Sequence, residues 1–268
     1  MIIFKTENSI ETYRAKAKAK DINELSGRTG RPDLTKFVIA QMLLNIPVKH
    51  DSILVDIGCG NGVFLLECAK NRLDSCAGRL IGILPTSEEV SRVRNHILHS
   101  QGNNKHLICI ELGTAEKTNI PSNYCDTLAC NGVLLILQNE KNVSSALTEF
   151  YRVTKLGGTI FIGEMPDSNE MEGENYGDSI SSWLIWVLKN QGVKSFISRL
   201  RQTVTALFSS EPFVVAPKNL FYMPPSDFIA LLNRHGIEVT KHYRHKEVDG
   251  LGNVSDSKTR WNYIGIKR

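Results

Sequence analysis

The stretch Val55-Asp56-Ile57-Gly58-Cys59-Gly60-Asn61-Gly62 decides the fold of this 268-residue chain. It continues an apolar run that begins at Ile53, and such a run, ended by an acid and alternating glycines, is typical of a buried strand followed by a tight loop. Glycine has no Cβ and adopts positive φ, so a ligand can lie against the bare backbone of the loop. Apolar residues at helical spacing follow from 63 to 71. Strand, loop and helix together predict a nucleotide cradle outside the carboxyl end of the strand.

The spacing of the glycines excludes two kinds of nucleotide site. A dinucleotide fingerprint, G-x-G-x-x-G, needs a third glycine where this chain has Val63. A G-x-x-x-x-G-K-[ST] pattern is absent from the sequence, which excludes a P-loop. The remaining pattern, D-x-G-x-G-x-G from Asp56 to Gly62, resembles the first motif of class I S-adenosylmethionine-dependent methyltransferases.

Strands and helices alternate along the chain on either side of this loop. Strands are predicted at 79–84, 106–110, 126–130 and 159–163, and helices at 34–45, 87–100 and 144–153. This alternation predicts one α/β domain with a mainly parallel sheet. It is interrupted after Pro166 by a polar loop and a helical stretch at 179–208, and it resumes with a helix at 228–234. Two last strands are predicted at 237–240 and 261–266, with a polar loop at 249–258 between them.

Four further segments resemble the methyltransferase family in the same order along the chain. They are 81–89 (second strand and helix start), 113–116 (a turn that meets adenine), 131–134 (the loop after the fourth strand) and 146–158 (a helix and glycine turn). The resemblance implies a Rossmann-like, seven-stranded, mainly parallel sheet with helices on both faces. It also implies one antiparallel strand, which the last two strands can supply, and here a helical insertion follows the fifth strand.

The resemblance implies S-adenosyl-L-methionine as the cofactor and assigns its contacts. Asp56 would serve the methionyl amino group, and Asn131 would lie beside the sulfonium. The remaining predicted cofactor residues are the backbone at Gly58, Cys59 and Gly60, the strand end at Leu84 and Pro85, and the adenine turn at Thr114, Ala115 and Glu116.

Two positions depart from the family pattern. Leu84 stands where the family usually has an acid that binds both ribose hydroxyls, and Thr114 stands where the adenine turn often has an acid. Ribose recognition must then come from the backbone, from Thr86 or Ser87, or from elsewhere. These departures leave one alternative open, namely a protein that has diverged from the family and binds the cofactor without catalysis.

Catalytic and substrate-binding residues are predicted from their positions. Glu164 follows the fifth strand, where functional side chains of open α/β sheets gather, and it is the candidate general base; a solvated loop acid is the alternative. Tyr13, Arg28 and Arg31 belong to a predicted N-terminal helical lid at 1–46, where the two arginines can grip a carboxylate or phosphate. Trp183 is predicted to form an apolar substrate wall in a second lid, the insertion at 167–222.

Composition bounds the partners. The net charge of +4 is too small to predict a nucleic-acid site, which would need a concentrated basic patch. The six cysteines form no C-x-x-C pair, so neither a metal site nor a disulfide framework is predicted. No apolar run approaches the ~18 residues of a membrane span, and a cytoplasmic location is expected.

We therefore predict an S-adenosylmethionine-dependent methyltransferase acting on an oxygen of a small molecule, a sugar or a glycan precursor, with an anionic acceptor as one option. One alternative is a C-methyltransferase for a quinone- or lipid-like substrate, with the tryptophan-containing helix as its pocket. The other is a non-catalytic cofactor-binding protein. For the insertion, a substrate lid ranks before a homodimer interface and a membrane-surface contact.

Overall fold

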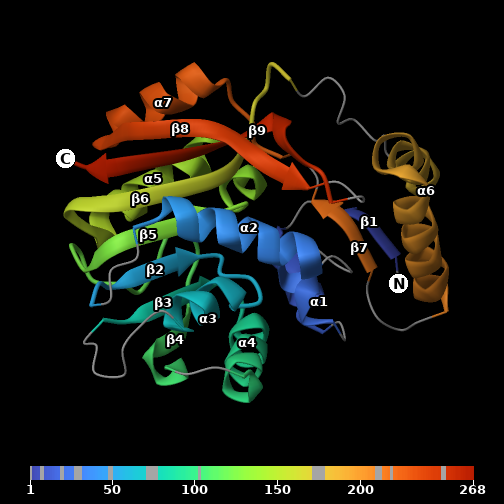
Figure 1. The fold of residues 1–268 in the computed structure, drawn as a ribbon, viewed down its shortest axis with the longest axis horizontal. Coiled ribbons are helices and arrows are strands. Elements are labelled where there is room, and N and C mark those ends of the chain that lie inside the picture. Colours follow the sequence, from blue (N-terminus) through green and yellow to red (C-terminus); the bar gives the residue numbers. More distant parts are fainter. Residues whose placement is uncertain are drawn as a thin grey trace.

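The main body of the protein, a computed structural model, is a seven-stranded sheet with the strand order β4-β3-β2-β5-β6-β9-β8 (Figure 1). The structure describes residues 2–6, 9–18, 21–26, 32–47, 51–70, 78–101, 104–170, 179–208, 213–217, 220–248 and 252–268. Neighbouring strands are parallel except at β9, which is antiparallel to both β6 and β8. The predicted mainly parallel, seven-stranded sheet is therefore confirmed. Its strands are β2 (Leu54–Ile57), β3 (Leu80–Leu84), β4 (Ile108–Leu112), β5 (Cys125–Asn131), β6 (Thr154–Pro166), β8 (Ile237–Val248) and β9 (Val254–Lys267).

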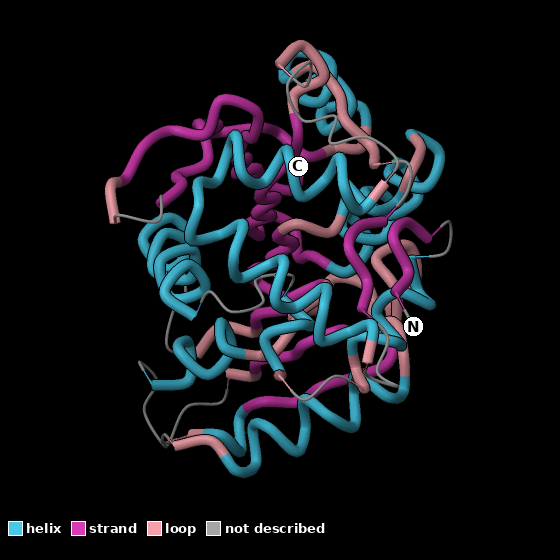
Figure 2. The backbone as a smooth tube through the Cα atoms, turned by 90° about the vertical axis from the view of Figure 1, so that its right-hand side faces the viewer, coloured by secondary structure: helices cyan, strands magenta, loops and turns pink. Residues whose placement is uncertain are grey.

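Helices cover both faces of the sheet (Figure 2). One face carries α2 (Pro32–Asn45), α3 (Val63–Lys70) and α4 (Ser87–His99), and the other carries α5 (Glu140–Val153) and α7 (Pro225–Arg234). Because side chains of a strand alternate between faces, Leu54 of β2 packs with the first group of helices and Val55 with the second. The α/β alternation seen in the sequence thus builds two apolar cores, one on each side.

Strand β2 lies at the centre of the parallel part of the sheet. Asp56 at its carboxyl end is in register with Gly82 of β3 and Ala129 of β5. Because the three strands are parallel, their carboxyl ends meet at one edge of the sheet. That edge is where the loops that follow them gather.

A second, two-stranded sheet was not predicted. β1 (Ile2–Thr6) pairs in parallel with β7 (Phe213–Pro217), so the N-terminal segment and the insertion are joined, although both were expected to be helical. The pairing joins residues far apart in the sequence, and five-residue strands carry too little periodicity to reveal it. The segment also contains α1 (Ser9–Lys16) and the short helix η1 (Ile22–Ser26), and the insertion contains α6 (Ile180–Leu207).

Helix α6 stands beside the small sheet, on the side away from the seven-stranded sheet (Figure 1). It is kinked at Gly192, where φ is 80° and ψ is 174°. Neither α6 nor any other helix in the described part of the chain has the length and apolar character required to cross a membrane.

The last two strands are longer than predicted. Residues 254–258, which were expected to belong to a loop, are part of β9, which begins at Val254, while β8 extends to Val248. An ion pair between Lys246 and Asp256 joins opposite residues of the two strands. Cross-strand pairs of opposite charge favour pairing that composition alone does not indicate.

Replacing Gly82 with alanine is expected to destabilise the fold by about 1–3 kcal/mol, because overpacking a filled core has costs of that size. An added Cβ would lie 2.6 Å from Cys59 Sγ, 2.7 Å from Ile110 Cδ1 and 2.9 Å from Leu65 Cδ1. Urea unfolding of Gly82→Ala should show this loss, and Cys109→Ala, at an exposed position of β4, is the control. An unchanged midpoint for Gly82→Ala would contradict the packing described here.

Candidate functional site

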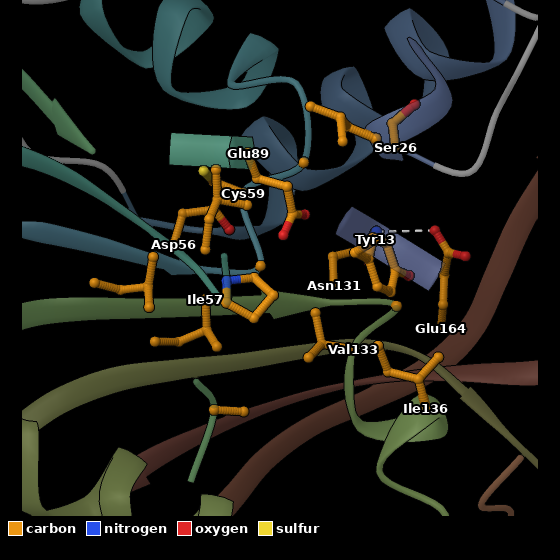
Figure 3. Close-up of a pocket in the computed structure, with 18 of the residues that line it drawn as sticks. Tyr13, Ser26, Asp56, Ile57, Cys59, Glu89, Asn131, Val133, Ile136 and Glu164 are labelled. Atoms are coloured by element: carbon orange, nitrogen blue, oxygen red, sulfur yellow. Dashed lines mark hydrogen bonds between the residues drawn. The ribbon is translucent and has the colours of Figure 1, made fainter. Parts of the chain in front are cut away.

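A cavity of about 520 Å³ opens at the carboxyl edge of the sheet, over the ends of β2, β3, β5 and β6 (Figure 3). This volume falls within the ~300–1,000 Å³ typical of small-molecule sites. The walls come from the N-terminal segment, namely α1, η1 and α2. All ten residues predicted to contact a cofactor line the cavity: Asp56, Gly58, Cys59, Gly60, Leu84, Pro85, Thr114, Ala115, Glu116 and Asn131.

The glycine loop after β2 is shaped by close packing on both sides. Gly58 and Gly60 adopt φ of +68° and +55°, a region that residues with a Cβ rarely enter. A Cβ on Gly58 would also come 2.4 Å from Cγ2 of Val133, and one on Gly60 would come 3.4 Å from the carbonyl oxygen of Leu25. Only glycine fits at Gly58 without displacing its neighbour, so this part of the loop exposes backbone to the cavity.

Asp56 is a buried carboxylate at the cavity floor. Asp56 is only 4 % exposed, and its side chain accepts no hydrogen bond from any residue that the structure describes. Burial raises the pKa of Asp56 from its ordinary value of 3.8 to about 8. A buried carboxylate without partners is unfavourable, so this position is suited to a ligand that brings a positive charge or hydrogen-bond donors.

A second buried acid, Glu89, enters the cavity from the first turn of α4. The sequence predicts Glu89 only as part of the helix start within 81–89, not as a residue of the site. Thr86 caps the helix, and its hydroxyl donates to Glu89 Oε2 at 2.7 Å. Burial raises the pKa of Glu89 to about 7, although the hydrogen bond from Thr86 and the charge of Lys16 both lower it. An acid three residues after a threonine is also the sequence signature of a capping box. The sequence pattern therefore gives no sign that Glu89 lines the cavity.

The far end of the cavity carries a chain of three polar side chains. Asn131 donates from Nδ2 to Glu164 Oε1 at 2.8 Å (Figure 3). Arg260 Nη1 lies 3.3 Å from Glu164 Oε2. Glu164 itself sits at a register shift of β6 with φ of +58°. A left-handed non-glycine residue is held there at a cost of about 1–3 kcal/mol. Its backbone N–H donates to Asn262 Oδ1 at 3.0 Å, which helps to hold this conformation.

Arg260 was not predicted from the sequence. It lies on β9, in register with Pro166, and reaches the cavity only because β9 runs beside β6. No local motif marks an arginine in this position.

The adenine turn and the strand end are placed as the sequence predicted, on the side of the cavity near β3 and β4. The backbone of Thr114 and Lys117 closes the turn with a 2.9 Å hydrogen bond. Ala115 is packed into the core below the turn, while Glu116 lines the cavity. Contact of these residues with a cofactor stays a prediction.

The predicted substrate residues have different outcomes. Tyr13 of α1 lines the cavity, and Arg28 and Arg31 lie outside the described residues.

Trp183 does not line the cavity, which corrects its prediction as a substrate wall. It is 8 % exposed on α6, with the guanidinium carbon of Arg199 6.0 Å from its ring, and α6 stands beside the small sheet. The insertion instead reaches the cavity at Leu220.

Comparisons with known proteins agree with this geometry. A family described as "Methyltransferase domain" matches residues 55–162, which contain the glycine loop, the adenine turn and Asn131. No curated protein sequence is significantly similar to the chain.

Solved structures share the fold at low sequence identity. An S-adenosylmethionine-dependent methyltransferase from Thermotoga maritima is 15 % identical, with a TM-score of 0.57, 96 % of this chain covered and 100 % of that one. One from Methanosarcina mazei is 17 % identical, with a TM-score of 0.55 and coverage of 84 % and 96 %. One from Aquifex aeolicus is 14 % identical, with a TM-score of 0.55 and coverage of 93 % and 100 %.

Burial of Asp56 predicts a particular dependence of stability on pH. Because its folded pKa is raised, the folded protein retains a proton that the unfolded chain loses, so Asp56 lowers the stability progressively as pH rises from about 4 to about 8. Because the asparagine of Asp56→Asn cannot ionise, the free energy of unfolding of this variant should rise relative to that of the wild-type protein over that range. Urea unfolding at pH 5, 6, 7 and 8 measures it, with the exposed Asp51→Asn as the control. A difference that stays constant with pH would contradict the assignment.

Proposed function

Since the chain is a class I S-adenosylmethionine-dependent methyltransferase, we propose that it methylates a hydroxyl oxygen of a small polar molecule, such as a sugar or glycan precursor. The observation that carries this proposal is the ion pair of Glu164 and Arg260. In Figure 3, Glu164 lies at the opposite side of the cavity from Asp56.

The cavity fits the cofactor on evidence from its own residues. Asp56 is a buried, unpaired carboxylate among the described residues, which suits the ammonium of the methionyl group. At Gly58 and Gly60 the absence of side chains leaves backbone for the ligand to lie against. When bound, S-adenosylmethionine supplies a methyl group activated by its sulfonium.

The residues at the acceptor end are held in place before any substrate arrives. The Glu164 carboxylate is fixed by Asn131 on one oxygen and by Arg260 on the other. A fixed carboxylate can accept the proton of a hydroxyl nucleophile or anchor it by a hydrogen bond, and in both cases it orients the attacking oxygen. Arg260 adds a positive charge that suits an acceptor carrying a carboxylate or phosphate.

This polar end favours oxygen over carbon as the acceptor atom. The tryptophan helix that was expected to supply an apolar pocket for a quinone- or lipid-like substrate does not line the cavity. The cavity has apolar lining of its own, such as Leu135, Ile136 and Leu220, so the preference for oxygen rests on the ion pair of Glu164 and Arg260. The limited volume, which the cofactor must share, also favours a small acceptor.

The N-terminal segment acts as the lid over this site. Ile10 and Tyr13 of α1 line the cavity from above the sheet edge. Arg92 of α4 fastens the end of α1 by donating to the carbonyl oxygens of Lys16 at 3.1 Å and Ala17 at 2.7 Å. The insertion supports the lid through the β1–β7 pairing and contributes Leu220 to the wall.

The outer surface of α6 is left for another partner. Ile197 and Val204 of α6 are 58 % and 45 % exposed, and Phe208, directly after the helix, is 88 % exposed. A homodimer interface ranks before a membrane-surface contact for this helix, as in the sequence-based expectation.

The function is tested with cofactor carrying a ¹³C-labelled methyl group and a panel of sugars, sugar phosphates, hydroxy acids and quinones. We expect release of S-adenosylhomocysteine with hydroxylated acceptors, and a carbon chemical shift of the product that identifies an O-methyl group. A C-methyl product, or turnover with quinones alone, would overturn the proposal.

Glu164→Gln is expected to lower turnover by about a hundred-fold or more, because a positioned base contributes ~10²–10⁴ to the rate. Glutamine retains the shape and the hydrogen bond to Asn131 but loses the charge. The affinity for S-adenosylhomocysteine, measured by calorimetry, should be unchanged, since Glu164 lies at the acceptor end. Glu170→Gln is the matched control, because Glu170 forms a 3.6 Å ion pair with Arg244 outside the cavity. Full activity of Glu164→Gln across the pH range would remove Glu164 from the mechanism.

A further inference from the structure

We propose that Glu89 binds the two ribose hydroxyls of the cofactor, in place of the acid that this chain lacks at the end of β3. The inference concerns the cofactor alone and does not depend on the identity of the methyl acceptor. It gives a function to a buried carboxylate that neither the glycine loop nor the acceptor end uses.

The position of Glu89 in the cavity is the first observation. Its residue is 1 % exposed, yet it is among the residues that line the cavity. Figure 3 shows its carboxylate directed into the cavity, between Asp56 on one side and Tyr13 on the other. The side chain is therefore buried from solvent but presented to a ligand.

The second observation is that helix capping satisfies only one of its two oxygens. The Thr86 hydroxyl donates to Oε2, and the backbone N–H of Glu89 donates to the Thr86 hydroxyl oxygen at 3.3 Å. Within the described part of the chain, Oε1 accepts no hydrogen bond. A buried carboxylate needs further donors, and a vicinal pair of hydroxyls offers two that a carboxylate can accept together.

The order of the strands places this carboxylate at the ribose. Along the sheet edge the order is β4-β3-β2-β5, with the adenine turn after β4 and Asn131 at the end of β5. Helix α4 begins immediately after β3, so Glu89 enters between the adenine turn and Asp56. The ribose joins adenine to the methionine part of the cofactor. It must therefore lie between the adenine turn and Asp56, where Glu89 enters the cavity.

The strand end itself has no group for the ribose. Leu84 is 1 % exposed and belongs to the apolar cluster that also contains Val90 and Val93 of α4. The carboxylate is displaced by five residues, from the end of the strand to the first turn of the helix. That displacement explains how the departure from the family pattern at Leu84 is compatible with cofactor binding.

The test compares two ligands by calorimetry, S-adenosylhomocysteine and its 2′-deoxyribose analogue. The unchanged protein should bind the analogue about ten- to a hundred-fold more weakly, as expected for the loss of a hydrogen bond to a charged group. Glu89→Gln should bind S-adenosylhomocysteine more weakly by a similar factor and should no longer distinguish the two ligands. Glu88→Gln, one residue away and paired with Arg14 at 3.4 Å, is the matched control and should behave like the unchanged protein.

A purely structural role for Glu89 gives a different result. A capping residue would change the unfolding temperature and weaken both ligands equally, and that outcome overturns the proposal. Equal binding of the two ligands by the unchanged protein would also overturn it, and this measurement needs no variant to fold. The double variant Leu84→Asp/Glu89→Gln should regain the preference for the ribose ligand, because it returns a carboxylate to the strand end. None of these readouts involves the acceptor, so their failure leaves the proposed O-methylation standing.

Discussion

The pairing of β2 on both of its edges is the constraint on which the site depends. Asp56 lies between Gly82 and Ala129, so its backbone is fixed by two neighbouring strands. Because these strands are parallel, their carboxyl ends and loops gather at one edge, while helices on both faces bury the strands themselves. The chain must then place polar groups for a ligand in a setting where each of them is costly to bury.

Three acidic residues carry that cost in different ways. Asp56 and Glu89 are desolvated, which raises the pKa of both carboxyls. Glu164 instead occupies a left-handed backbone conformation and is held by Asn131 and Arg260. Polar groups that are fixed in advance reorganise little when a ligand binds, which favours function at the expense of stability. Desolvation and backbone strain therefore lower the stability of the fold, but they also leave polar groups in place for a ligand.

The walls of the cavity come from parts of the chain that lie far apart in sequence. The N-terminal segment supplies the wall through α1, and the insertion holds that segment by pairing β7 with β1. Arg92 adds a link from α4 to the carbonyl end of α1. The N-terminal segment is thus linked to the main body through α1 and to the insertion through β1.

The sequence alone determined the strands of the main sheet and the helices that cover its two faces, because these follow from local periodicity. The ten residues predicted to contact a cofactor all line the cavity, and they were found from the glycine spacing after β2 and from the segments that resemble the family. It also located Glu164 and Tyr13 at the cavity. Only the tertiary structure revealed the β1–β7 pairing, the contribution of Arg260 and the position of Trp183 outside the cavity. It also showed that Glu89, which looks like an ordinary capping residue, points its carboxylate into the site. Each of these depends on contacts between residues distant in the chain, and such contacts leave no periodic signal in the sequence.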